Sequence, residues 1–167
     1  MAILALLVAG LGGPSVATSD GKGAFKATLT GYEEVPAVST AAGGEFRAQL
    51  GEDGSTLSYV LTYSNIQNAF AAHIHFGQMS VNGGVSAFLC GGGDKPACPP
   101  TGGTVSDTID AADVIGPSAQ GISAGEFDEL LAAMRAGVTY VNVHTMMAGA
   151  PAGPGNLPGG EIRGQIK

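Results

Sequence analysis

The chain has 167 residues, which is enough for one domain with a proper hydrophobic core. Its net charge of -7 at pH 7 and its scattered basic residues argue against nucleic acid as a partner, because phosphate binding needs clustered Lys and Arg. The 28 glycines and 9 prolines, together with 44% hydrophobic residues, indicate short strands joined by tight turns rather than a disordered chain.

The N-terminal segment is typical of export. Residues 1–11 are an apolar run, and Ser15-Val16-Ala17 follows it like a signal-peptide cleavage site, although no basic residues precede the run. We therefore expect residues 1–17 to be a signal-peptide remnant and residues 18–23 a linker, with a buried first strand or a lipid-facing anchor as the alternatives. The run is too short to cross a bilayer as a helix, and we expect no stable membrane span elsewhere.

Residues 24–167 alternate between apolar and polar side chains in short segments that turn signals separate, which predicts strands. The clearest turn is Gly51-Glu-Asp-Gly54, where acids and glycines suit a hairpin. The predicted strands are 24–29, 44–50, 57–63, 71–76, 85–89, 104–109, 138–145 and 161–166.

One stretch, residues 118–137, has helical periodicity instead. Ser123 is expected to be the N-cap, with Glu126 completing a capping box, and Gly137 should end the helix. Together these elements predict a mainly β, single-domain protein. Its fold should be an antiparallel Greek-key β-sandwich or barrel of about eight strands with one inserted short helix.

The two cysteines, Cys90 and Cys98, lie in one Gly/Pro-rich loop. An even number of cysteines at close spacing predicts a local disulfide, which would add about 2.5 kcal/mol in the chain-entropy model. Such a bond indicates an oxidising, extracytoplasmic compartment, periplasmic or secreted. The alternative is a pair of free thiols in a flexible loop.

The segment Ala72-His-Ile-His-Phe-Gly77 contains two of the three histidines, His73 and His75, at a spacing that puts both on one face of a strand. The third, His144, ends the strand-like run Val138-Thr-Tyr-Val-Asn-Val-His144. If the two strands meet, three imidazoles can share one metal ion, with copper favoured and zinc second. Rings more than about 8 Å apart would exclude a shared site. Separate, structural histidines are the alternative.

Four motifs, in order along the chain, resemble the chordin-type (CHRD) domain family. They are Phe25-Lys-Ala-Thr-Leu-Thr-Gly-Tyr-Glu-Glu-Val-Pro36, Ala72-His-Ile-His-Phe-Gly77, Tyr140-Val-Asn-Val-His-Thr145 and Pro158-Gly-Gly-Glu-Ile-Arg-Gly-Gln165. This resemblance covers residues 24–167 and implies a secreted β-sandwich domain, but it implies no single activity.

The layout of the candidate site has a weaker similarity to copper/zinc superoxide dismutases. In that family a His-x-His pair, a later histidine and an arginine that guides the substrate occur in the order of His73, His75, His144 and Arg163. The bridging histidine and the zinc cluster have no counterpart here, so the similarity implies a copper site with three protein nitrogens and an open position. By this similarity Arg163 would be catalytic, attracting a small anion such as superoxide.

Several charged and polar residues have competing interpretations. Arg163 is expected either to attract the anion or to form an ion pair with Glu33, Glu34 or Glu161 that holds the last strand. Glu161 is also the one carboxylate considered for an iron site with two histidines. Asn142 or Thr145 is expected to support a ligand histidine by a hydrogen bond.

Two functions follow for a secreted protein of this kind. The first is a mononuclear copper protein with redox chemistry like that of superoxide dismutase, for which a protein partner is not specified. The second is a non-enzymatic extracellular module that binds another protein or a surface and uses its histidines structurally. The sequence leaves open whether the protein is an enzyme.

Overall fold

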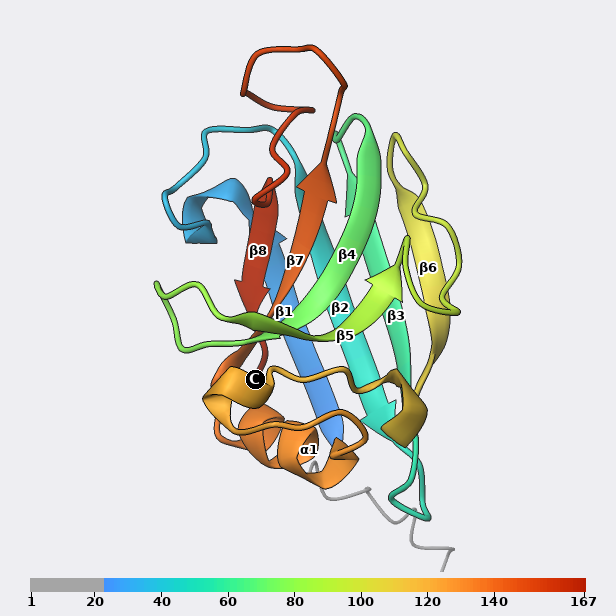
Figure 1. Cartoon of the computed structure of the whole chain (residues 1–167). Coiled ribbons are helices and arrows are strands. Elements are labelled where there is room, and N and C mark those ends of the chain that lie inside the picture. Colours follow the sequence, from blue (N-terminus) through green and yellow to red (C-terminus); the bar gives the residue numbers. More distant parts are fainter. Residues whose placement is uncertain (1–22) are drawn as a thin grey trace, which may run out of the picture.

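The computed structural model describes residues 23–167, so the expected signal remnant at 1–17 and all but the last residue of the expected linker lie outside the described residues. Eight strands and one α-helix make up the domain (Figure 1). The strands are β1 (Ala24–Thr30), β2 (Gly43–Leu50), β3 (Leu57–Ser64), β4 (Ala69–Phe76), β5 (Gly84–Cys90), β6 (Gly103–Ile109), β7 (Thr139–Thr145) and β8 (Ile162–Gln165). Every predicted strand is present, with bounds that differ by at most two residues.

All eight strands belong to one sheet, and every pairing in it is antiparallel. The strand order is β5-β4-β7-β8-β1-β2-β3-β6, and the edge strands β5 and β6 approach each other to leave a nearly closed barrel (Figure 1). The connections from β3 to β4 and from β6 to β7 cross to distant strands. The predicted mainly β, Greek-key barrel type of fold is therefore confirmed.

Alternation along the strands separates the inside of the barrel from the outside. In β3, every second residue is buried, and these residues pack into the core with those of β1 and β2. In β4 and β7 the same rule places Ile74, Val141 and Val143 in the core. The intervening side chains of these two strands, which include all three histidines, consequently lie on the outer face of the sheet.

The helix is shorter than the sequence predicts. Helix α1 spans Phe127–Arg135, and the expected first turns are instead a separate 3-10 helix, Ser118–Gln120, and a turn. Ser123 is not the N-cap, although its backbone N–H donates to the Glu126 side chain, which is half of the predicted capping box. Gly121 and Gly125, with φ of 98° and 88°, interrupt the helical path before Phe127, so the helix begins later than expected.

The predicted disulfide joins Cys90, the last residue of β5, to Cys98, and the two Cα atoms are 5.0 Å apart. Within the same loop, the Lys95 ammonium contacts the Asp94 and Asp113 carboxylates at 3.0 and 2.6 Å. The disulfide closes the loop on itself, and the Lys95–Asp113 contact holds it against the 3-10 helix Ala111–Asp113.

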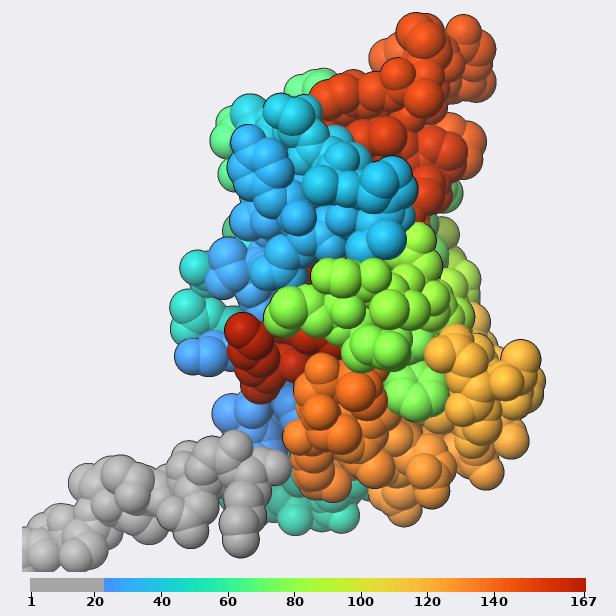
Figure 2. All heavy atoms as spheres, turned by 90° about the vertical axis from the view of Figure 1, so that its left-hand side faces the viewer, coloured from blue at the N-terminus to red at the C-terminus, as the bar shows by residue number. Residues whose placement is uncertain are grey.

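Two loops cover the outer face where the histidines lie. Residues 77–83 join β4 to β5, and residues 146–161 join β7 to β8. In Figure 2 the first loop (light green) lies beside the segment that follows β1 (blue), and Asn82 Nδ2 bonds to the Val35 carbonyl between them. None of the helices within residues 23–167 is long and apolar enough to cross a membrane.

Candidate metal centre

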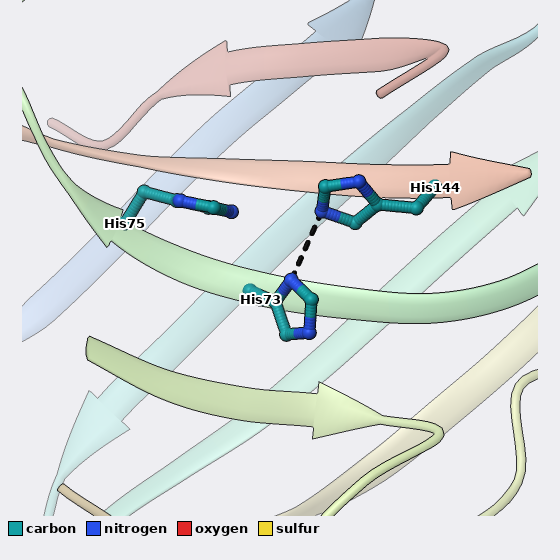
Figure 3. Close-up of side chains that lie close together, drawn as sticks. All are labelled: His73, His75 and His144. Carbon is teal, nitrogen blue, oxygen red and sulfur yellow. Dashed lines mark hydrogen bonds between the residues drawn. The ribbon is translucent and has the colours of Figure 1, made fainter. Parts of the chain in front are cut away.

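Strands β4 and β7 are direct neighbours, and this pairing brings the three histidines together. Ala71 lies opposite His144, and His73 lies opposite Asn142 in the antiparallel register. A register irregularity between Ala69 and Ala71 adjusts the end of β4 beside His144. The rings of residues 73, 75 and 144 then converge between the two strands (Figure 3).

The three rings form one compact cluster. Their centroids lie 4.7 Å apart for His73 and His144, 5.4 Å for His73 and His75, and 5.7 Å for His75 and His144. One nitrogen from each ring can be chosen so that all three lie within 4.8 Å of one another. The histidines therefore meet the distance criterion set from the sequence, and the cluster is the one group of three or more such ligands in the described residues.

Backbone carbonyls fix the protonation pattern of two rings. His144 Nδ1 lies 3.0 Å from the Pro158 carbonyl oxygen, and His75 Nδ1 lies 3.1 Å from that of Gly83. A carbonyl only accepts hydrogen bonds, so both Nδ1 atoms carry the proton, and in the neutral ring each Nε2 keeps a lone pair.

The protonation of the third ring follows from that of the other two. His73 Nδ1 lies 2.9 Å from His144 Nε2 (Figure 3). Because that Nε2 holds a lone pair, His73 Nδ1 is the donor. The Nε2 atoms of His73 and His75 are buried and have no hydrogen-bond partner. The cluster therefore presents buried lone pairs that nothing among the described residues satisfies.

Burial keeps the three imidazoles neutral. Loss of solvent, reinforced by the neighbouring histidines, lowers the pKa of His73 to about 3. Loss of solvent, with smaller contributions from His144 and Arg163, lowers the pKa of His75 to about 4 although the Gly83 hydrogen bond opposes it. Desolvation also lowers the pKa of His144. Neutral imidazole is the form that binds metal, so protons do not compete for these nitrogens near pH 7.

The donor set fits a metal ion bound by nitrogen. Metal–nitrogen bonds of about 2.0–2.1 Å place two ligands of a tetrahedral ion about 3.3 Å apart, so the cluster would contract by about 1 Å or more at its widest pair. Binding uses the His144 Nε2 lone pair and so replaces its hydrogen bond with His73. The two carbonyl-bonded rings already present Nε2, which is the pattern expected of metal-binding histidines.

Aromatic rings enclose the cluster. Phe88 meets the His73 ring edge-on at 4.6 Å, and Tyr140 stacks on His75 with ring centroids 4.8 Å apart and planes 4° from parallel. Phe70 lies 6.3 Å from the His144 ring. His73 is the most exposed of the three histidines, so a small ligand would approach the cluster from the side of this ring.

Arg163 lies in the protein interior, with only 1% of its surface exposed. Its guanidinium stacks 3.4 Å from the Tyr140 ring centroid and donates to the Gln78 and Val81 carbonyls and to Asn82 Oδ1. The predicted ion pair with Glu33, Glu34 or Glu161 was wrong, since no carboxylate of the described chain lies within 4.0 Å of the guanidinium. Anion guidance by Arg163 stays a prediction that this burial does not favour.

The residues expected to support the histidines have other partners. Asn142 donates to Glu34 at 2.8 Å, and Thr145 donates to Glu161 at 2.8 Å. Glu161 also accepts from Thr40 and from the Gly155 N–H, so both its oxygens are engaged and it does not join the histidines in a carboxylate-containing iron site. These expectations failed because adjacency on a strand does not say which groups the flanking loops present.

The actual supports are the Gly83 and Pro158 carbonyls, which the sequence reasoning missed. Every residue has a carbonyl, so composition and spacing give no sign of these two. The available signal was indirect. Pro158 begins one of the motifs quoted above, and Tyr140, whose hydroxyl accepts from the Gly83 N–H, begins another.

A family model for the CHRD domain matches residues 25–166, almost the whole described chain. The protein belongs to the CHRD domain family. Comparison with curated proteins and with solved structures found no significant match. The similarity of site layout to copper/zinc superoxide dismutase is therefore still a prediction.

Membership of the CHRD family supports an extracellular type of interaction module. CHRD domains occur in extracellular proteins, and the Cys90–Cys98 disulfide is a bond that persists in oxidising compartments. Both observations support a location outside the cytoplasm for this CHRD domain.

Proposed function

We propose that this CHRD domain binds one copper ion through His73, His75 and His144 and that the bound ion carries out redox chemistry on a small oxygen species such as superoxide. The observation that carries the proposal is the pair of buried Nε2 atoms on His73 and His75 without partners, beside a third ring whose Nε2 is a lone-pair donor. An unsatisfied buried polar atom costs about 1–3 kcal/mol, and a metal ion would remove that cost.

Copper is favoured over zinc by the donor set. Three neutral imidazoles suit both metals, and affinity for Cu²⁺ exceeds that for Zn²⁺ at a given nitrogen site. A bound copper ion would supply one-electron transfer by cycling between its two oxidation states. The protein holds the rings, and the aromatic side chains of Phe88 and Tyr140 limit access of water to the cluster.

Copper binding is tested by metal titration and electron paramagnetic resonance. We expect the wild type to retain about one Cu²⁺ per chain after dialysis and to show coupling of the electron spin to imidazole nitrogens. His75→Ala should lose most of the metal. Ile74→Val is the matched control, because it removes a buried methyl group from the opposite face of the same strand and leaves the ligands intact.

Retention of less than about half an equivalent by the folded wild type would rule out the copper site. Superoxide consumption by the loaded protein is a second, separate measurement. If the protein binds copper but consumes superoxide no faster than free Cu²⁺ does, the metal site is retained and the enzymatic function is ruled out.

A second candidate is a module that binds another protein. The family match favours it, and so do exposed apolar side chains on the two neighbouring segments around Tyr32 and Met79, which are 74% and 58% exposed. In this case His→Ala variants would lower stability without changing partner binding. Folded histidine variants that lose a redox activity would contradict this candidate.

A further inference from the structure

The last strand and its flanking residues, Gly160-Glu-Ile-Arg-Gly164, bury two opposite charges. Glu161 and Arg163 are each 1% exposed, and neither pairs with an opposite charge within 4.0 Å in the described chain. Burying ionised groups without an ion pair is costly, so a compensating set of hydrogen bonds is expected for each. Those hydrogen bonds lead to two different loops.

Arg163 holds the loop at residues 77–83. Its guanidinium donates to the carbonyls of Gln78 and Val81 at 3.1 and 3.0 Å and to Asn82 Oδ1 at 3.3 Å. The next residue of that loop is Gly83, whose carbonyl accepts from His75 Nδ1. Arg163 therefore reaches His75 through three consecutive loop residues, 81–83, without a hydrogen bond to the ring itself.

Glu161 holds the other loop. One carboxylate oxygen accepts from the Gly155 N–H at 2.7 Å and from Thr145 Oγ1 at 2.8 Å, and Thr145 Oγ1 in turn accepts from the Leu157 N–H at 3.0 Å. The following residue, Pro158, supplies the carbonyl that accepts from His144 Nδ1. As with Arg163, a buried charged group is bonded to a loop, and a carbonyl of that loop accepts from a histidine Nδ1.

The backbone of this segment is fitted closely to the site. Gly160 has φ of 130°, and a Cβ there would collide with the Asn142 amide and Glu34. A Cβ at Gly164 would collide with the backbone of Thr28 in the neighbouring strand β1. The two glycines let the segment approach its neighbours, so the buried charges between them are held at fixed positions.

We propose that Glu161 and Arg163 are positioning residues for the histidine cluster, each fixing the tautomer and orientation of one ring through a separate loop carbonyl. Arg163 sets His75 through Gly83, and Glu161 sets His144 through Pro158. His73 has no carbonyl partner and is the ring free to change its partner when an ion binds. Where it describes how copper is held, this inference rests on the proposed function. The effect of Glu161 and Arg163 on the histidine rings does not require a metal ion.

Nuclear magnetic resonance of metal-free protein labelled with ¹⁵N-histidine tests the coupling, because it distinguishes a protonated from a bare ring nitrogen. In the wild type we expect His75 and His144 to be Nδ1–H tautomers, the less common form in water. Arg163→Met should convert His75 to a tautomer mixture and leave His144 unchanged. Glu161→Leu should do the reverse, since a leucine side chain cannot accept the two hydrogen bonds that one carboxylate oxygen now accepts.

Each variant is the matched control of the other, because both residues are buried to the same extent and lie two positions apart. The unaffected histidine also reports that the variant is folded. Two milder variants serve if either fails to fold: Asn82→Ala removes an exposed partner of Arg163, and Thr145→Val removes the hydroxyl between Glu161 and Leu157. The first should affect His75 alone, and the second His144 alone.

Equal changes at both rings, or no change at either in folded variants, would overturn the proposal. Copper affinity is the second readout, and we expect each variant to lose about 10- to 100-fold, as for other groups that orient metal-binding histidines. If the wild type binds no copper, the proposed function fails while the tautomer result still decides the positioning role.

Discussion

At the scale of single residues, the buried carboxyl of Glu34 has the most unusual surroundings. It is 7% exposed, accepts from the Asn142 amide at 2.8 Å, and lies near the charges of Arg163 and Glu161. Burial outweighs the hydrogen bond and Arg163, and it raises the pKa of Glu34 to about 7 from an ordinary value of 4.5. The folded protein therefore binds a proton at Glu34 over a pH range in which the unfolded chain has released it.

This shift predicts a pH-dependent stability difference for Glu34→Gln. Between pH 4.5 and 7 the folded state binds more protons at this site, so the wild type loses free energy of unfolding as pH rises through that window. The uncharged variant has no such loss. Relative to wild type, it should gain about 3 kcal/mol by pH 8 and almost nothing at pH 4.5.

Urea unfolding of both proteins across this pH range measures the difference. The histidines are common to the two proteins, so their opposite contribution cancels in the comparison. Their folded-state pKa values are lowered, and they destabilise both proteins alike as pH falls below about 6.5. A stability difference that is constant with pH would show that folding does not shift the pKa of Glu34.

Arg163 shows at the same scale how burial changes the meaning of a charged residue. Its position in the chain order suggested an anion guide, but its guanidinium bonds to loop carbonyls and stacks on Tyr140. A charge that steers an anion acts through solvent, whereas the Arg163 guanidinium is engaged in hydrogen bonds with the loop at residues 77–83. Sequence could predict that Arg163 lies in the last strand, but not which way its loop partners fold over it.

At the scale of elements, the pairing of β4 with β7 is what brings the three histidines together. The i, i+2 spacing of His73 and His75 predicted correctly that both rings share a face. That His144 joins them depends on a crossover from β6 to β7, which places β7 beside β4 rather than beside β6. Several strand orders are compatible with the same alternation, so the sequence pattern does not decide whether His144 lies beside the other two histidines.

The loop between β5 and β6 gives a prediction at this scale. Replacing both cysteines, in Cys90→Ala/Cys98→Ala, opens a disulfide that closes eight residues of chain. We expect a loss of about 2.5 kcal/mol in the free energy of unfolding, because the unfolded chain regains the conformational freedom of the loop. Urea unfolding checks this value.

Wild-type protein treated with a reducing agent is the control, since it loses the bond without losing side-chain volume. The double variant should match the reduced wild type within about 1 kcal/mol. A double variant as stable as the oxidised protein would contradict this entropic contribution of the disulfide.

For the whole molecule, metal binding should be coupled to folding. The three candidate ligands come from β4 and β7, which are second and third in the order of the sheet, and the chain between His75 and His144 includes two further strands and the helix. An unfolded chain would not hold these rings together, so the copper binding proposed above would favour the folded state. At free Cu²⁺ one hundred times Kd, we expect the free energy of unfolding to rise by about 2.7 kcal/mol.

Thermal or urea unfolding with buffered Cu²⁺, compared with excess chelator, measures this gain. The His75→Ala protein should show no more than a small part of it. An equal gain in the variant would mean that copper acts at another place on the surface, and no gain in the wild type would contradict binding to the folded cluster.

The sequence by itself determined the positions of the strands, the location of the disulfide and the three histidines as candidate ligands. These features are local, because side-chain alternation, cysteine spacing and histidine spacing are all properties of neighbouring residues. Tertiary structure alone decided that the three rings meet, that the Gly83 and Pro158 carbonyls accept from two of them, and that Arg163 and Glu161 are buried. The reason is that these contacts join segments far apart in the chain through backbone groups that every residue possesses, so no pattern of side chains records them.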